Sequence, residues 1–335
     1  MTKHSLDLLS VGAGPVGLYG AYYAGVRGLR TAVIDSLSEV GGQVSALYPE
    51  KLILDVAGFP AIKGRELVAA LATQAASAKP LYLLGQQAVE LSTDQHGRQH
   101  VITSGGDEID CGAIVLTAGI GTFTPRTLPA GEKFLGRGLE YFVPDPLPYT
   151  GANVVIVGGG DSALDWALML EPIASRVTVV HRRKAFRAHP ATVAQVEASS
   201  VELITDAEVR ALRGNETLER AHITVKGEDE PRVLDCQKVV AALGFLANIG
   251  PLREWGLQLH DNRHIVVDSA MRTARAGVYA AGDITEYDGK VRLIAVGYGE
   301  VATAVNNAAV FINPDAALFP GHSTDEQPTQ AMAAV

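Results

Sequence analysis

One arrangement of residues occurs twice in this chain and limits strongly what it can fold into. In the first copy, a strand-like run over residues 6–11 leads into the glycine-rich segment Gly12–Gly17, and a helical segment and a second strand follow. In the second copy, residues 153–157 lead into Gly158–Ala163, again with a helix and a strand after it. A strand, a glycine-rich turn, a helix and a second strand make one parallel β-α-β unit. The repeat therefore predicts an α/β protein with two Rossmann-like, three-layer domains.

Each glycine-rich segment contains the parts of a dinucleotide site. The first glycine allows a tight turn out of the strand, and the second lets the backbone approach a pyrophosphate. The third position must be small so that the helix can pack against the strand, and the start of the helix offers N–H groups to the phosphates. The positions concerned are Gly12, Gly14 and Gly17 in the first copy and Gly158, Gly160 and Ala163 in the second.

The residue that follows the second strand distinguishes the two sites. Asp35 in the first copy is a carboxylate suited to the hydroxyls of a ribose that carries no 2′-phosphate. The second copy has His181 at the same offset, followed by Arg182, Arg183 and Arg187, whose guanidinium groups pair with phosphate. We therefore expect NADPH at the second site. The first site takes the other dinucleotide, which in a protein with two such sites is usually FAD.

A third motif, Gly277–Asp283, combines a strand with small residues, a glycine and an aspartate. It predicts that the chain returns to the first site, where Asp283 would hold the ribityl chain or the phosphate region of FAD. The FAD domain is then discontinuous, with residues 1–121 and 248–335, and the NADPH domain, 122–247, is inserted into it. The two crossovers would lie side by side and form a natural hinge.

Composition excludes several classes of protein. The net charge is −9 with no tract of Lys and Arg, which argues against a nucleic-acid partner. No apolar run reaches the roughly 18 residues of a membrane span, and no secretory signal is present, so we expect a cytoplasmic protein. Cys111 and Cys236 are far apart and are expected to be small core residues. His260 and His264 flank a turn-like segment, so we expect no metal site.

The order of these motifs resembles the low-molecular-weight thioredoxin reductase family along nearly the whole chain. That family carries a C-x-x-C motif in the NADPH domain, shortly before the second glycine motif. Here Phe142 and Asp145 stand where the two cysteines would be. Because disulfide exchange needs a dithiol, the sequence excludes thioredoxin reduction.

The chain more closely resembles the thioredoxin-reductase-like ferredoxin–NADP⁺ reductases, which share the stretches 46–51, 55–60 and 320–324. The resemblance implies a homodimer in which the tail of one subunit reaches the flavin of the other. It makes Tyr48 and His322 candidates for stacking on the flavin. The FAD contacts that it implies are Asp35, Gln43, Tyr48, Ala88, Phe123, Asp283 and Thr324.

The same resemblance implies hydride transfer from NADPH to FAD, then single-electron transfer to ferredoxin or flavodoxin, with the reverse flow also possible. Two alternatives stay open: an NADPH diaphorase or oxidase acting on quinones or oxygen, and a non-enzymatic NADPH-sensing flavoprotein. Ferredoxins and flavodoxins are typically acidic, as this chain is, so docking needs a local basic patch. The candidates for that patch are Arg126, Lys133, Arg137 and the Arg182 region.

Overall fold

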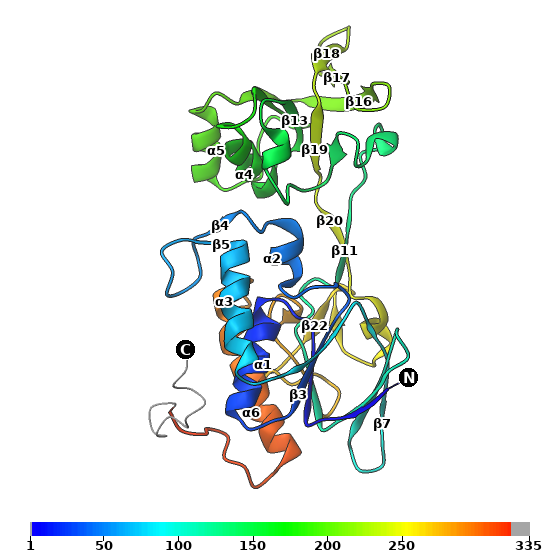
Figure 1. The fold of residues 1–335 in the computed structure, drawn as a ribbon, viewed down its shortest axis with the longest axis vertical. Helices are drawn as coiled ribbons and strands as arrows, with labels where there is room; N and C mark the ends of the chain where they lie inside the picture. Colours follow the sequence, from blue (N-terminus) through cyan, green and yellow to red (C-terminus); the bar gives the residue numbers. More distant parts are fainter. Residues whose placement is uncertain (1, 323–335) are drawn as a thin grey trace. The chain divides into compact units, whose positions relative to one another are not determined.

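The computed structural model describes residues 2–322, and the chain divides into two compact units (Figure 1). The first unit takes in the chain up to Phe123 and again from Ala247, and the second is Thr124–Leu246. Both units contain a parallel sheet with helices packed on it, so the expected α/β fold is confirmed. The assignment of one unit to FAD and the other to NADPH stays a prediction.

The first unit is built on a five-stranded parallel sheet with the strand order β23-β10-β2-β3-β6. Its central strands are apolar and buried because both faces of the sheet are covered. The strands are β2 (Leu8–Val11), β3 (Thr31–Asp35), β6 (Leu81–Leu84), β10 (Ala113–Leu116) and β23 (Val278–Ala280).

Helices cover one face of this sheet, and a second sheet contributes to the core on the other side (Figure 1). The helices are α1 (Pro15–Val26), the short α2 (Gly42–Leu47), α3 (Gly64–Ala76) and α6 (Ile294–Ile312). The second sheet has the order β1-β9-β8-β7, with β1 (Lys3–Ser5), β7 (Ala88–Thr93), β8 (Gln99–Thr103) and β9 (Glu108–Cys111). Smaller elements are β4 (Leu52–Ile53), β5 (Ile62–Lys63), the 3-10 helix η3 (Gly250–Glu254), β21 (Leu259–His260), β22 (His264–Val266) and β24 (Thr285–Glu286).

The second unit has its own parallel sheet, in the order β12-β19-β13-β14-β15. Along β13, Val154 and Ile156 belong to a core shared with helix residues, whereas Val155 and Val157 belong to a core shared with an antiparallel sheet. This alternation gives the unit three layers. Its elements are η1 (Glu132–Phe134), β12 (Leu139–Glu140), η2 (Leu147–Tyr149), β13 (Asn153–Gly158), α4 (Asp161–Leu170), β14 (Arg176–Val180), α5 (Pro190–Glu197), β15 (Glu202–Ile204), β16 (Ala207–Arg213), β17 (Arg220–Val225), β18 (Arg232–Asp235) and β19 (Lys238–Ala242).

The two segments that join the units pair with each other. They are β11 (Thr122–Pro125) and β20 (Phe245–Asn248), which form a two-stranded sheet. The Thr122 hydroxyl donates to the Asn248 carbonyl at 3.1 Å, and the Arg126 N–H donates to the Gly244 carbonyl at 2.9 Å. The expectation that the crossovers lie side by side is confirmed.

Both cysteines are free and buried, as expected from the sequence. Cys111 ends β9 and Cys236 directly follows β18, so one lies in each unit. Within residues 2–322, no helix is long and apolar enough to cross a membrane.

Candidate nucleotide sites

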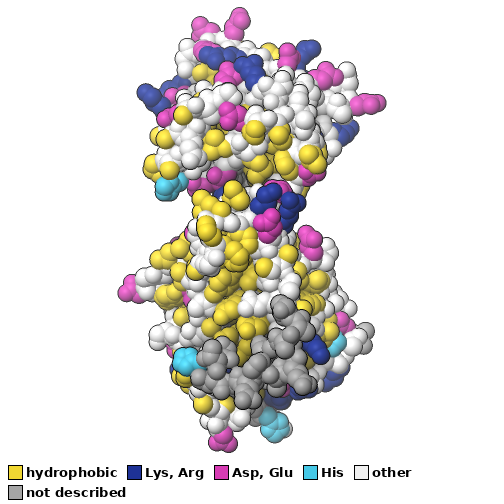
Figure 2. All heavy atoms as spheres, turned by 60° about the vertical axis from the view of Figure 1, so that its left-hand side comes forward, with side chains coloured by type: hydrophobic (Ala, Val, Ile, Leu, Met, Phe, Trp, Pro, Cys, Tyr) yellow, Lys and Arg dark blue, Asp and Glu magenta, His cyan; other side chains and the backbone are white. Residues whose placement is uncertain are grey.

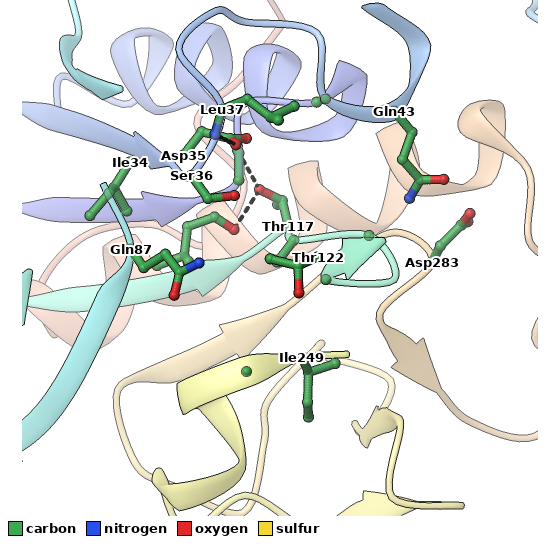
Figure 3. A pocket seen from close by; sticks show the side chains of 18 of the residues that line it. Ile34, Asp35, Ser36, Leu37, Gln43, Gln87, Thr117, Thr122, Ile249 and Asp283 are labelled. Carbon is green, nitrogen blue, oxygen red and sulfur yellow. Dashed lines mark hydrogen bonds between the residues drawn. The ribbon is translucent and has the colours of Figure 1, made fainter. Parts of the chain in front are cut away.

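The first unit contains a cavity of about 480 Å³ at the carboxyl ends of β2, β3 and β10. Ligands of open parallel sheets bind at this edge, and the volume is typical of a small-molecule or cofactor site. Figure 3 shows Asp35 and Gln87 toward one end of the cavity and Gln43 and Asp283 toward the other. The cavity is therefore elongated between two groups of polar side chains, as an extended dinucleotide requires.

The three glycines of the first motif have different surroundings. A Cβ atom on Gly12 would lie 2.5 Å from the Thr117 carbonyl oxygen, and the φ of +117° also favours glycine. A Cβ atom on Gly17 would lie 1.9 Å from the Gly12 carbonyl oxygen. By contrast, nothing lies within 4 Å of the Cβ position of Gly14, which caps α1 and lines the cavity. The first and third glycines are needed for packing, and the second leaves space for a ligand.

Asp35 is held in place by backbone groups. Its Oδ2 accepts a hydrogen bond from the Ala13 N–H at 2.7 Å, and its Oδ1 accepts one from the Leu37 N–H at 2.9 Å. Burial raises the pKa of Asp35, while these N–H groups and that of Ser36 oppose the rise. The carboxyl group is thereby tied to the glycine-rich turn on one side and to the loop after β3 on the other.

Gln43 and Tyr48 line the cavity from α2 and its C-terminal end, and Asp283 lines it from the turn between β23 and β24. Burial raises the pKa of the Tyr48 hydroxyl to about 12, and the negative charges of Asp283 and Asp55 add to this effect. Burial also raises the pKa of Asp283, which Lys290 and Arg292 counteract. The phenol therefore stays neutral at physiological pH and offers a flat aromatic face with a hydrogen-bond donor.

Thr117 is a site residue that sequence reasoning missed. It follows β10, lines the cavity and donates from its hydroxyl to the Gly12 carbonyl at 2.8 Å (Figure 3). The same hydroxyl is 3.3 Å from the Ser10 hydroxyl. No local motif surrounds Thr117, so only the pairing of β10 with β2 brings it to the turn. Gln86, Gln87, Thr122 and Ile249 also line the cavity and were missed.

Most of the proposed FAD contacts lie around this cavity. Gly12, Gly14, Asp35, Gln43, Tyr48, Ala88 and Asp283 line it, and Gly17 lies behind the turn against Gly12. Phe123 belongs to β11, and Thr324 lies outside the described residues. His322 is exposed, contacts the Phe319 ring edge-on at 5.1 Å, and does not line the cavity of this single chain.

The second glycine motif repeats the spatial pattern of the first. A Cβ atom on Gly158 would lie 2.4 Å from the Ala242 carbonyl oxygen, and Ala163 packs 3.1 Å from the same position. Nothing lies within 4 Å of the Cβ position of Gly160, which caps α4. The capping glycine therefore leaves open space at the start of α4, as it does at the start of α1, and such a helix start is suited to bind an anion.

The basic loop after β14 is folded onto this motif. The buried His181 stacks on Phe186 with 5.3 Å between ring centroids, and its Nε2–H donates to the Ala185 carbonyl at 3.2 Å. The Arg187 N–H donates to the Gly159 carbonyl at 2.7 Å. Burial lowers the pKa of His181, and the charges of the neighbouring arginines lower it further. His181 is thus a neutral residue inside the loop.

The arginines of this loop remain available to a ligand. Arg182, Arg183 and Arg187 are all exposed, on the loop that leads from β14 to α5. The loop is fixed at its far end as well, because the His189 N–H donates to Asp161 Oδ1 at 2.8 Å. Guanidinium groups near an open helix start can bind both the pyrophosphate and a 2′-phosphate.

The two histidines near residue 262 lie in a small hairpin. His260 is exposed, and the Nδ1–H of the half-buried His264 donates to the Asp283 carbonyl at 3.1 Å. Among the residues that the structure describes, no three His, Cys, Asp or Glu side chains form a group that could hold a metal ion.

Comparison with known proteins gives a consistent result. Residues 6–308 match the model of the pyridine nucleotide-disulphide oxidoreductase family. A ferredoxin–NADP reductase of Nocardioides sp. is 60% identical over 96% of this chain and 97% of that protein. One from Salinispora tropica is 59% identical over 96% of this chain and 99% of its own length. Among solved structures, the thioredoxin reductase of T. acidophilum has a TM-score of 0.79 at 25% identity and covers 93% of this chain and 100% of its own.

Proposed function

This chain belongs to the pyridine nucleotide-disulphide oxidoreductase family, and we propose that it is an FAD-dependent ferredoxin–NADP reductase that transfers electrons between NADPH and ferredoxin. The observation that carries the proposal is the position of its two thiols: Cys111 and Cys236 are free and fully buried, one in each unit, and neither lines the cavity. Burial also raises the pKa of each thiol, which disfavours the reactive thiolate. A disulfide-exchange route is closed, and electrons must leave from the flavin.

The cavity of the first unit fits FAD. Above Gly14 it leaves the space that a pyrophosphate needs, next to the start of α1. In this proposal Asp35 accepts hydrogen bonds from the adenosine ribose, Asp283 orients the ribityl region, and Tyr48 covers part of the flavin and excludes water. The bound flavin supplies the ability to take a hydride from NADPH and to release electrons singly.

The second unit supplies the NADPH site in this proposal. Gly160 leaves open space at the start of α4 for the pyrophosphate, and Arg182, Arg183 and Arg187 bind the 2′-phosphate. Hydride transfer itself requires no acid or base from either unit. The residues of both units act by binding and orienting the nucleotides.

We further propose that the functional form is a homodimer. Apolar side chains gather on the face of the first unit seen in Figure 2. Leu54 and Phe319, both in the first unit, are 70% and 61% exposed. Light scattering on the purified protein tests this proposal, and a monomer at micromolar concentration would overturn it.

A two-stage experiment tests the activity. Purified protein should be yellow, and NADPH added without oxygen should bleach it. Cytochrome c reduction should then depend on added ferredoxin, with flavodoxin tested in parallel. Full activity without a carrier would indicate the diaphorase or oxidase instead. A yellow protein that binds NADPH without bleaching would be a sensor, and protein that binds no FAD would contradict the proposal as a whole.

A variant without cysteines tests whether the thiols take part in electron transfer. The C111A/C236A double variant should keep full ferredoxin-dependent activity, because both sulfur atoms are buried away from the cavity lining. Loss of activity in a folded, FAD-loaded double variant would show that a cysteine takes part in electron transfer.

A further inference from the structure

A buried ion pair lies next to the turn that carries Asp283. The side chains of Lys290 and Glu300 are only 1% and 4% exposed, and Lys290 Nζ is in contact with Glu300 Oε1. Glu300 is the only charged residue in the sequence of α6, whose other buried residues are glycine, alanine and valine. The Tyr287 hydroxyl also donates to Glu300 Oε1, at 2.6 Å. Burying two charges costs free energy, so such a pair is weak support for stability by itself.

This ion pair holds one residue by both of its backbone polar groups. The Gly282 N–H donates to Glu300 Oε2 at 2.7 Å, and Lys290 Nζ donates to the Gly282 carbonyl at 3.0 Å. The peptide groups on both sides of Gly282 are therefore fixed in direction. The next residue is Asp283, whose side chain lies at the cavity (Figure 3).

We propose that Lys290 and Glu300 are positioning residues of the flavin site: as a charge-balanced pair they fix the Gly282 turn and so aim Asp283 at the bound FAD. This inference rests on the proposed FAD site of the first unit. The pair also adds no net charge beside the cofactor. The two partners act on Asp283 in opposite senses, since Lys290 lowers the pKa of that carboxyl and Glu300 raises it.

The test uses the FAD-loaded protein and two single variants, Lys290→Met and Glu300→Gln. Reduction adds electrons to the flavin, so an unpaired negative charge nearby opposes it and an unpaired positive charge favours it. The midpoint potential of bound FAD should therefore fall in Lys290→Met and rise in Glu300→Gln. The FAD dissociation constant should rise about tenfold or more in both, because a charged hydrogen bond to Gly282 is lost.

The second unit offers a matched control. There Lys238 Nζ lies 3.3 Å from Glu140 Oε1, and the Tyr149 hydroxyl donates to Glu140 Oε2 at 2.6 Å. This Lys–Glu–Tyr group has the same composition, is more exposed (22% for Lys238 and 29% for Glu140), and belongs to the second unit, whereas the cavity lies in the first. Lys238→Met and Glu140→Gln should leave both the flavin potential and the FAD dissociation constant unchanged.

The rise in the FAD dissociation constant in both variants tests the aiming of Asp283. The opposite shifts in potential test the charge balance of the pair, which loss of stability alone would not produce. Shifts of equal sign, or no difference from the control variants, would overturn the inference. If a single variant does not fold, Lys290→Arg decides: it keeps the charge and should restore a wild-type potential, and a potential shifted from wild type would overturn the inference. Wild-type protein that binds no FAD would overturn the proposed function as well.

Discussion

Two glycines of the first motif should have different roles, Gly17 in folding and Gly14 in binding. In Gly17→Ala, the new Cβ atom would meet the Gly12 carbonyl oxygen at 1.9 Å, so the melting temperature should fall by several degrees. Gly14→Ala places its methyl group in open space, where it blocks a pyrophosphate but no protein atom. This variant should keep the melting temperature of the FAD-free protein and purify with much less FAD. Normal FAD content in Gly14→Ala would contradict the proposed position of the pyrophosphate.

Three arginines should decide between NADPH and NADH. Replacement of Arg182, Arg183 or Arg187 by Ala should raise the KM for NADPH about ten- to a hundredfold, since each removes a charge-assisted bond to the 2′-phosphate. The KM for NADH should hardly change. Steady-state dye reduction with both nucleotides measures this effect. Arg210→Ala is a suitable control, because Arg210 lies on β16 and pairs with Glu208; a similar effect there would argue against a specific phosphate site.

At the scale of an element, the basic loop should depend on pH through His181. Folding lowers the pKa of this imidazole below its ordinary value of 6.5, so the folded unit binds fewer protons than the unfolded chain. Its contribution to stability is complete above about pH 6.5 and is lost as the pH falls toward the lowered pKa of the folded state. Between about pH 7.5 and 5.5, the wild-type melting temperature should fall more than that of His181→Gln, which keeps the donor to Ala185.

The comparison of wild type with His181→Gln also removes the pH effects of other titrating groups. Burial also lowers the pKa of His264 in the first unit, so wild-type protein alone would not isolate His181. His264 is unchanged in both proteins, and its effect cancels in the difference. If the melting temperatures of wild type and His181→Gln changed with pH by the same amount, folding would not lower the pKa of His181.

The elements and their order could be predicted from the sequence because they rest on local signals. Strand-like runs, glycine spacing, the residue that ends β3 and the residue that follows β14 lie within short segments, and these signals located Asp35 and His181. Thr117 was missed because it lies 105 residues from the Gly12 carbonyl that it contacts. Lys290 and Glu300 were missed because their role depends on how a turn packs against α6. The sequence did offer one signal for this role: Glu300 is a single carboxylate in an otherwise uncharged, largely apolar helix.

For the molecule as a whole, the paired linkers make relative motion of the two units testable. β11 and β20 are short and form only a two-stranded sheet, a suitable position for a hinge. Because Cys111 and Cys236 are buried, cysteines introduced at exposed positions would react alone with a bifunctional reagent. Cross-linking between the units should lower ferredoxin-dependent turnover without loss of FAD. Equal turnover after cross-linking would exclude a required hinge motion.

The net charge of the chain leads to a specific test of how ferredoxin docks. The chain carries −9, so an acidic carrier is repelled overall and must be attracted by a local patch. Arg126, Lys133 and Arg137 are exposed near the start of the second unit. If they form that patch, the KM for ferredoxin should rise with salt, because attraction between exposed charges more than about 10 Å apart is largely screened at 0.1 M. Arg126→Glu with Arg137→Glu should raise this KM at low salt and flatten its salt dependence, while NADPH-dependent dye reduction stays unchanged. A salt-insensitive KM in the wild type would place docking on an apolar surface instead.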